Sequence, residues 1–159
     1  MNHNDRLTRL RYALDIKDAD MVKIFQLGGV SLNKKEVQSL MIKKPSNDEE
    51  VGAENEYELV CSDEQFERFL NGFITFERGP KDGKEPALEL NQANANNIFL
   101  KKVKIALSLT SDDILDILED AGVEISNSEL SAVLRREGHR NYKPCGDRYI
   151  RNFLKGLAM

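Results

Sequence analysis

The 159-residue sequence has two cysteines, two histidines and no long apolar run, and each scarcity excludes a class of protein. Cys61 and Cys145 are too few to cross-link a fold in an oxidising compartment. Together with His3 and His139, they also lack the spacing of a zinc site. No apolar run approaches the roughly 18 residues that span a bilayer, and the charged start MNHNDRLTRLRYAL is unlike a signal peptide. We therefore expect a cytoplasmic protein without a membrane segment.

The sequence also lacks the short motifs of common enzyme classes. It contains no phosphate-binding loop, no Rossmann glycine pattern and no metal-ligand spacing. His139, in REGHRNY, is expected in an exposed loop rather than as a catalytic base. The carboxylates between residues 112 and 120 are spread around a helix by its geometry. We therefore expect no catalytic residue, no cofactor and no metal, and a protein that is not an enzyme.

Charge is distributed unevenly along the chain. Hydrophobic residues make up 40% and charged residues 31%, a soluble globular composition, and the formal net charge of −4 argues against a protein that coats nucleic acid. Between Ser46 and Glu67 there are nine acidic residues and no Lys or Arg. Between Leu130 and Lys155 there are seven basic residues and two acidic ones. The second half of the chain is therefore expected to carry a basic surface.

The sequence repeats itself. A shift of 93 positions places identical or similarly apolar residues over one another from Asn4 to Leu40, and the register resumes at a shift of 84 from Cys61 to Gly72. The identical pairs include Asn4 and Asn97, Gly29 and Gly122, Cys61 and Cys145, and Gly72 and Gly156. The first copy therefore has a loop that is nine residues longer, the difference between the two shifts.

Each copy is predicted to form four helices. The first runs from about residue 5 to 15, and again from about 98 to 108. An asparagine stands before each of them, Asn4 or Asn97, and its side chain is expected to accept the free amides of the first turn. In the second copy the second helix is expected to begin with Ser111 as its cap.

The second helix is expected to end at Gly29 and at Gly122, since glycine takes the left-handed helix-ending conformation without steric cost. A third helix then starts at Ser126, with Glu129 completing a capping box, and at Asn33 in the first copy. The fourth helix follows each cysteine with an apolar stripe at i, i+3, i+4 and i+7. The stripe residues are Phe66, Phe69, Leu70 and Phe73, and in the second copy Ile150, Phe153, Leu154 and Leu157.

We therefore expect an all-α protein of two homologous four-helix repeats with helix-turn-helix-like elements. The first repeat is predicted at residues 1–78 and the second at 94–159, with a linker containing proline and glycine at 79–93. A repeat of roughly 60 to 75 residues has a marginal core of its own. The two tandem repeats are accordingly expected to pack on each other, about a pseudo-twofold axis in the simplest arrangement.

Four segments carry a resemblance to a known family: NNIFLKKVKIALSLTSDDILDIL, CGDRYIRNFLKGLA, FLNGFITFERG in the first copy and PALE in the linker. Over nearly its whole length the chain resembles the bacterial YehS-like family, a tandem domain of unknown function. The resemblance implies a bacterial cytosolic protein, and it implies no activity, cofactor or catalytic residue. The acidic stretch PSNDEEVGAENEYELV resembles a local expansion relative to that family.

The helix, stop and helix between Asp112 and Arg136 resemble a DNA-binding helix-turn-helix. In that motif the first residues of the second helix contact base edges. The turn GVEIS is longer than usual for DNA binding, however, and angled helix pairs are common in all-helical domains. The residues in the reading position would be Asn127, Ser128 and Glu129, and in the first copy Lys34, Lys35 and Glu36.

The most promising surface is a basic cluster in the second copy, with Tyr142 and Tyr149 among it. Arginine's planar guanidinium suits phosphate or carboxylate, and tyrosines anchor protein partners or stack on bases. The alternative is a set of solvated charges that balance the acidic stretch at 46–67. The candidate residues for anion or partner binding are Arg135, Arg136, Arg140, Lys143, Arg148, Arg151 and Lys155. A second basic set recurs on the first helices, at Lys101, Lys102 and Lys104 and at Arg6, Arg9 and Arg11.

Cys61 and Cys145 each precede a predicted helix, where amide dipoles lower a thiol pKa and raise its reactivity. The favoured interpretation is a small apolar side chain packed just before the helix, because free cysteines are usually buried. A disulfide between the two is disfavoured in a cytosolic protein.

The sequence thus favours a non-enzymatic binding or regulatory module that acts through protein contacts. A helix-turn-helix-type DNA-binding regulator is the alternative. A protein partner is expected before a nucleic acid, no membrane contact is expected, and a homo-oligomer stays open.

Overall fold

The computed structural model describes residues 1–45, 54–80, 83 and 86–159, and in them the chain is all-α. These residues form eight helices and no strand beyond one bridge between Lys43 and Tyr57. The helices of the first repeat are α1 (His3–Leu14), α2 (Asp18–Leu27), α3 (Lys34–Ser39) and α4 (Asp63–Arg78). Those of the second repeat are α5 (Ala95–Ala106), α6 (Ser111–Asp120), α7 (Asn127–Leu134) and α8 (Asp147–Leu157). The all-α fold of two four-helix repeats is therefore confirmed.

Part of two predicted segments lies outside the described residues. The acidic stretch expected to be a local expansion includes residues 46–53, and the predicted linker at 79–93 includes residues 81–82 and 84–85, none of which the structure describes.

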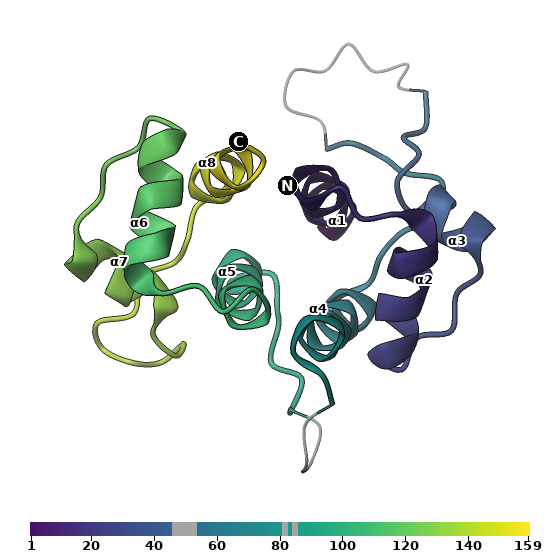
Figure 1. Cartoon of the computed structure of the whole chain (residues 1–159), viewed down its shortest axis with the longest axis horizontal. Helices are drawn as coiled ribbons and strands as arrows, with labels where there is room; N and C mark the ends of the chain where they lie inside the picture. The colour runs from purple at the N-terminus through teal and green to yellow at the C-terminus, as the bar shows by residue number, and fades with distance from the viewer. Residues whose placement is uncertain (46–53, 81–82, 84–85) are drawn as a thin grey trace.

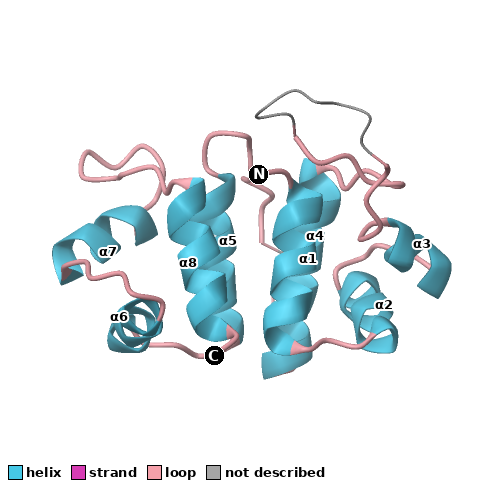
Figure 2. Ribbon diagram, turned by 90° about the horizontal axis from the view of Figure 1, so that it is seen from above, coloured by secondary structure: helices cyan, strands magenta, loops and turns pink. Residues whose placement is uncertain are grey.

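The two repeats pack on each other through the first and fourth helix of each. α1, α4, α5 and α8 form the centre of the molecule (Figure 1) and run side by side, with α2 and α3 on one flank and α6 and α7 on the other (Figure 2). α4 contacts α5 and α1 contacts α8. Since α1 corresponds to α5 and α4 to α8, these contacts are related by a pseudo-twofold axis along the viewing direction of Figure 1.

One hydrophobic core runs through both repeats. Phe66 of α4 is fully buried, stacks on His3 with ring centroids 4.6 Å apart, and stacks on Phe99 of the other repeat at 5.7 Å. The predicted stripes of α4 and α8 are buried in this core, except that Leu157 is half-buried. Burial of each large apolar side chain stabilises the fold by about 1.5 to 3 kcal/mol. The shared core therefore explains why the two repeats stay together.

The prediction that Asn4 and Asn97 cap the first helices is wrong. α1 begins two residues earlier than predicted, and Asn2 is its cap, with the Asn2 side chain accepting the amide of Asp5 at 2.8 Å. α5 begins after Asn94. Asn4 and Asn97 therefore lie inside the first turn of each helix, where both are buried.

Asn4 and Asn97 instead connect three separate segments of their own repeats. The Asn4 side-chain amide donates to the carbonyls of Leu40 and Leu59, both at 2.8 Å, and its oxygen accepts from the amide of Cys61 at 3.0 Å. The second repeat has the same three bonds. Asn97 donates to Val133 and Lys143, both at 2.9 Å, and accepts from Cys145 at 2.9 Å. These equivalent bonds show that the sequence repeat is also a structural repeat.

The other predicted helix ends are mostly confirmed. Gly29 and Gly122 have φ of +88° and +86°, which is the left-handed conformation expected of them. Asn33 and Glu36 form a complete capping box, whereas only the bond from the Glu129 amide to the Ser126 side chain is present in the second repeat. α6 is capped by Thr110 rather than by the predicted Ser111.

Gly72 and Gly156 lie where the fourth helix of each repeat crosses the second. A Cβ atom on Gly72 would lie 2.0 Å from the carbonyl oxygen of Ile24, and one on Gly156 would lie 2.0 Å from that of Ile117. Both distances are far inside van der Waals contact. The helices therefore cross in backbone contact, which only glycine permits.

Replacing Asn4 or Asn97 by alanine is expected to destabilise the protein by about 2 to 4 kcal/mol in each case. Each change leaves one buried carbonyl, one part-buried carbonyl and one buried amide without the side-chain partner that holds them. Urea unfolding followed by circular dichroism measures the loss. The control is Asn141→Ala, an exposed residue whose side chain forms no bond in the described structure, with an expected change within about 0.5 kcal/mol. Equal stability of all three variants would contradict the role of the two asparagines.

Candidate binding surface

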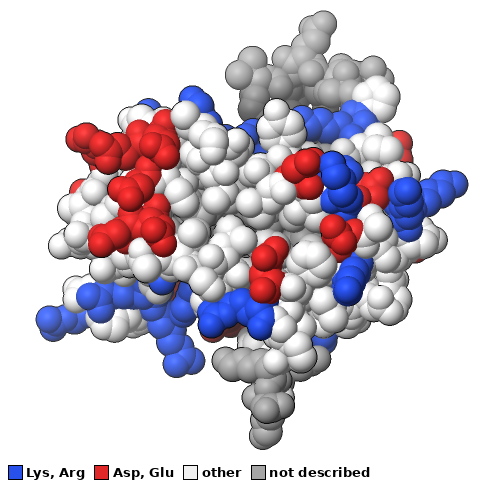
Figure 3. All heavy atoms as spheres, in the orientation of Figure 1, with Lys and Arg blue, Asp and Glu red and all other residues white. Residues whose placement is uncertain are grey.

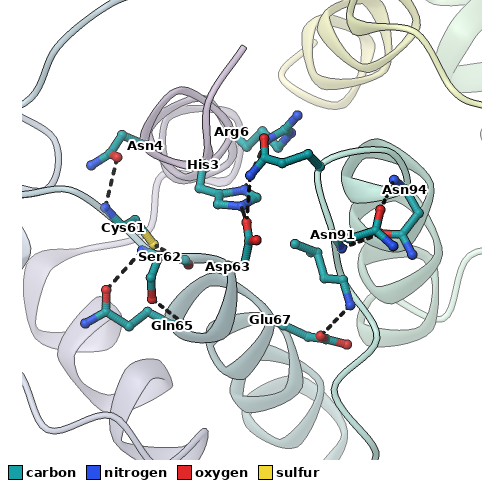
Figure 4. A network of polar contacts seen from close by, with 12 residues as sticks. His3, Asn4, Arg6, Cys61, Ser62, Asp63, Gln65, Glu67, Asn91 and Asn94 are labelled. Atoms are coloured by element: carbon teal, nitrogen blue, oxygen red, sulfur yellow. Dashed lines mark hydrogen bonds and ion pairs between the residues drawn. The ribbon is translucent and has the colours of Figure 1, made fainter.

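A polar network joins the two repeats at the start of α1 (Figure 4). The Nε2 atom of His3 lies 2.5 Å from Oδ1 of Asp63, and the guanidinium of Arg6 donates to Nδ1 of His3 at 3.0 Å. Arg6 also donates to Oδ1 of Asn96, in the other repeat, at 2.8 Å. Because guanidinium nitrogens only donate, Nδ1 of His3 is an acceptor and the proton of the neutral ring is on Nε2.

His3 is therefore a structural residue. Burial lowers its pKa, and the charge of Arg6 acts in the same direction, whereas Asp63 opposes the shift. Both ring nitrogens already have partners, so neither is available to a substrate or a metal. A general base needs a nitrogen within reach of the proton that it removes.

The second repeat has an equivalent contact built from different residues. Asn96 corresponds to His3, and its amide donates to Oδ1 of Asp147 at 2.8 Å and to the carbonyl of Cys145 at 2.9 Å. The amino group of Met1 forms an ion pair with Asp147 at 3.1 Å. The first carboxylate of α4 and of α8 is thus bound by the equivalent residue of α1 and of α5.

A buried ion pair holds α4 against α5 and the chain that precedes α5. Glu67 is 1% exposed, and its Oε1 accepts the amides of Glu89 and Leu90, both at 2.8 Å. Its Oε2 lies 3.4 Å from Nζ of Lys102, which also donates to the side chain of Asn71. This carboxylate therefore fixes the chain between the repeats against α4.

The cysteines have the packing role that the sequence favoured. Cys61 and Cys145 are both buried and both free. Burial raises the pKa of each thiol to about 12, so the thiols stay protonated near neutral pH and are poor nucleophiles. The alternative of a reactive thiol at a helix start is wrong for both.

Other candidate chemistry is also missing from the described residues. Within them, no group of three or more His, Cys, Asp or Glu side chains is placed to hold a metal ion. His139 is exposed in the loop after α7. None of the described helices is long and apolar enough to cross a bilayer.

The helix pairs that resemble a helix-turn-helix are α2 with α3 and α6 with α7. α3 has six residues and α7 has eight, which leaves little helix to lie in a groove. The side chain of Glu36 accepts the amide of Asn33 and is therefore already bound. These features favour helix packing over base reading.

The seven predicted basic residues are all exposed, and they fall into two groups. Those at the end of α7 and in the following loop are Arg135, Arg136, Arg140 and Lys143, and those on α8 are Arg148, Arg151 and Lys155. None of them forms an ion pair within the described part of the chain. Figure 3 shows basic side chains gathered over the loop after α7, next to acidic side chains over α6.

Lys101 is a residue that the sequence did not connect with this cluster. It lines the same small pocket as Arg135, Arg136 and Tyr142, between the start of α5 and the loop after α7. Asn97 brings these segments together by its bonds to Val133 and Lys143. The sequence feature that could have indicated this position of Lys101 is the repeated asparagine Asn97, four residues before it.

Comparisons with known proteins give a family but no activity. The model of the family "Protein of unknown function (DUF1456)" matches residues 3–79 and 96–159, which are the two segments that contain the two repeats. The chain is 39% identical over 158 residues to the "Uncharacterized protein YehS" of Escherichia coli (strain K12), covering 99% of this chain and 95% of that protein. No solved structure matches the chain.

Replacing His3 by asparagine, the residue at the equivalent position 96, is expected to flatten the pH dependence of stability. His3 has a lower pKa in the folded protein than in the unfolded chain, so the unfolded chain takes up a proton first as the pH falls. The free energy of unfolding of the unmodified protein should therefore decrease as the pH falls below about 6.5. Urea unfolding between about pH 7.5 and about pH 5 measures the slope.

The exposed His139 provides the control for this experiment. His139→Asn should keep the slope of the unmodified protein, because this change leaves His3 and its buried contacts intact. If the slope is unchanged in His3→Asn but lost in His139→Asn, the pH dependence of stability does not come from His3.

Proposed function

Because the chain belongs to the DUF1456 family, whose description gives no function, we propose a function from its own surface: a non-enzymatic binding module that contacts an acidic region of a partner protein. The contact is made by the loop after α7, in a second repeat that we take as residues 94–159. The proposed partner is cytoplasmic, in keeping with a chain that has only two cysteines, both buried and free.

The observation that carries this proposal is a set of exposed cations without partners. The seven basic residues from Arg135 to Lys155 have no ion pair in the described structure, although the acidic face of α6 lies beside the loop group. By contrast, the buried ionisable groups are used up by internal contacts, among them His3, Glu67 and Lys102. The exposed basic residues are therefore the charged groups that remain available to bind a partner.

The magnitudes favour several weak contacts over one strong one. An exposed ion pair contributes about 0.2 to 1 kcal/mol. A group of four cations can therefore supply a few kcal/mol to a complex and raise its rate of association, and both effects decrease as salt is added.

Duplex DNA fits this surface less well. The net charge is −4, and the acidic side chains over α6 lie next to the basic loop, where a DNA duplex would bring phosphates close to them. The two lysines in the reading position of the first repeat, Lys34 and Lys35, belong to a helix of six residues. Binding of DNA is therefore an outcome against which the proposal is tested.

Two double variants separate these functions. Arg135→Ala with Arg136→Ala is expected to weaken binding of a polyglutamate peptide about fivefold, because two exposed ion pairs of roughly 0.5 kcal/mol each are lost. Lys34→Ala with Lys35→Ala removes the same charge from the first repeat and should leave peptide binding unchanged. Fluorescence anisotropy of a labelled peptide measures both at low salt.

The same variants are titrated with random duplex DNA over about 50 to 200 mM salt. Steeply salt-dependent DNA binding that is lost in the Lys34 and Lys35 variant would replace the proposal with a DNA-binding function. Equal loss of peptide binding in both variants would mean that net charge alone is at work.

A further inference from the structure

The pocket between the start of α5 and the loop after α7 has a volume of about 210 Å³. Lys101, Arg135 and Arg136 line it, and Tyr142 forms part of its wall. Sites for small organic ligands usually measure roughly 300 to 1,000 Å³. The pocket is therefore better suited to the end of one side chain or to a small anion than to a cofactor.

The equivalent place in the first repeat contains an internal carboxylate. The residue after Asn4 is Asp5, whose Oδ1 accepts a hydrogen bond from the hydroxyl of Tyr57 at 2.6 Å. The residue after Asn97 is Ile98, which lines the pocket of the second repeat. The carboxylate that binds the tyrosine in one repeat is thus missing from the other.

Tyr142 is one position along the chain from Asn141, the residue equivalent to Tyr57, and it lacks the partner that Tyr57 has. Tyr57 is two residues before Leu59 and Tyr142 is one residue before Lys143, and the repeated asparagines bind the carbonyls of Leu59 and Lys143. The hydroxyl of Tyr142 is closed off from solvent and has no hydrogen-bond partner among the described residues. A buried hydroxyl in this state is destabilising by about 1 to 3 kcal/mol.

The charges around the pocket leave an excess of one positive charge. Three cations line it, Lys101, Arg135 and Arg136, and two acidic residues do, Glu89 and Glu137. Glu137 already accepts hydrogen bonds from two asparagine side chains, at 3.1 and 3.2 Å. Within the described structure none of the three cations has an ion pair. One added carboxylate would balance the charge.

We propose that this pocket binds the carboxylate of an aspartate or glutamate side chain of the partner protein, in the place that Asp5 occupies in the first repeat. The Tyr142 hydroxyl, which is closed off in the free protein, turns toward this carboxylate and donates to it, and the carboxylate pairs with Arg135, Arg136 or Lys101. The proposal rests on the proposed function, since it names the part of the acidic partner that the second repeat binds.

The pocket can be filled from within to test this. In Ile98→Asp the chain supplies its own carboxylate at the position equivalent to Asp5, and in Ile98→Asn it supplies a neutral side chain of the same shape. The probes are the blocked tripeptides acetyl-Gly-Glu-Gly-amide and acetyl-Gly-Gln-Gly-amide, and inorganic phosphate. Titrations of the ¹⁵N-labelled full chain are followed at the backbone amides of Tyr142 and Lys143.

The glutamate peptide is expected to shift these amides in the unmodified protein and in Ile98→Asn, and to bind at least tenfold more weakly to Ile98→Asp. Tyr142→Phe, which retains the ring and removes only the hydroxyl, should weaken binding severalfold. Equal binding of the glutamine peptide, or equal binding by Ile98→Asp and Ile98→Asn, overturns the proposal. Binding of phosphate without binding of the glutamate peptide also overturns it, in favour of a phosphate site.

Polyglutamate binding keeps this result separate from the wider function. If polyglutamate binding depends on Arg135 and Arg136 but is the same in Ile98→Asp and Ile98→Asn, the surface contact stands and the pocket proposal fails. If polyglutamate does not bind and the glutamate tripeptide does, the pocket stands as a carboxylate site and the proposed protein contact fails.

Discussion

Each half of this protein depends on one buried asparagine that binds three backbone groups. Asn4 and Asn97 hold the end of the third helix and the entry to the fourth against the first turn of the first helix. The bonded carbonyls lie at the end of the third helix and in the irregular chain before the fourth, and the bonded amide precedes the fourth helix, so no helical hydrogen bond satisfies these groups. The same side chain also accepts a hydrogen bond from the backbone amide of the cysteine before α4 or α8, and so fixes where the long central helix begins. The positions of α4 and α8, and the core that they share, follow from these bonds.

Much of the fold follows from the sequence because its signals are local. Apolar periodicity, the glycines at positions 29 and 122, and the internal repeat predict the helices and their number. The starts of the first helices were misplaced because an asparagine before an apolar stripe is typical of a cap, and a buried asparagine one turn later has the same local pattern. Its partners are 36 to 57 residues away in the first repeat, so only the folded chain identifies them.

The candidate surface was predictable in part. The basic residues from Arg135 to Lys155 are evident as a charge run, and their exposure agrees with that expectation. The pocket was not evident, because it depends on a difference between the two repeats, Asp5 against Ile98, that has meaning only when Tyr57 and Tyr142 are seen beside them. Duplication gives each half the same framework, and single substitutions within it then change which groups lack a partner. Such a difference has a large effect on the free energy of unfolding at a buried position, because no water molecule replaces the missing hydrogen-bond partner there.

Because of the glycines at positions 72 and 156, residues on the surface can change without a change in the packing of the interior. Where two helices meet through their backbones, no side chain sets their spacing, so the outer faces of α2 and α6 can exchange residues while the crossing stays unchanged. α6 carries five acidic residues and no Lys or Arg, whereas the charges on α2 are mixed, with Asp18, Asp20 and Lys23. After a duplication, one flank of such a protein can therefore acquire residues for a new partner while the arrangement of its central helices stays the same.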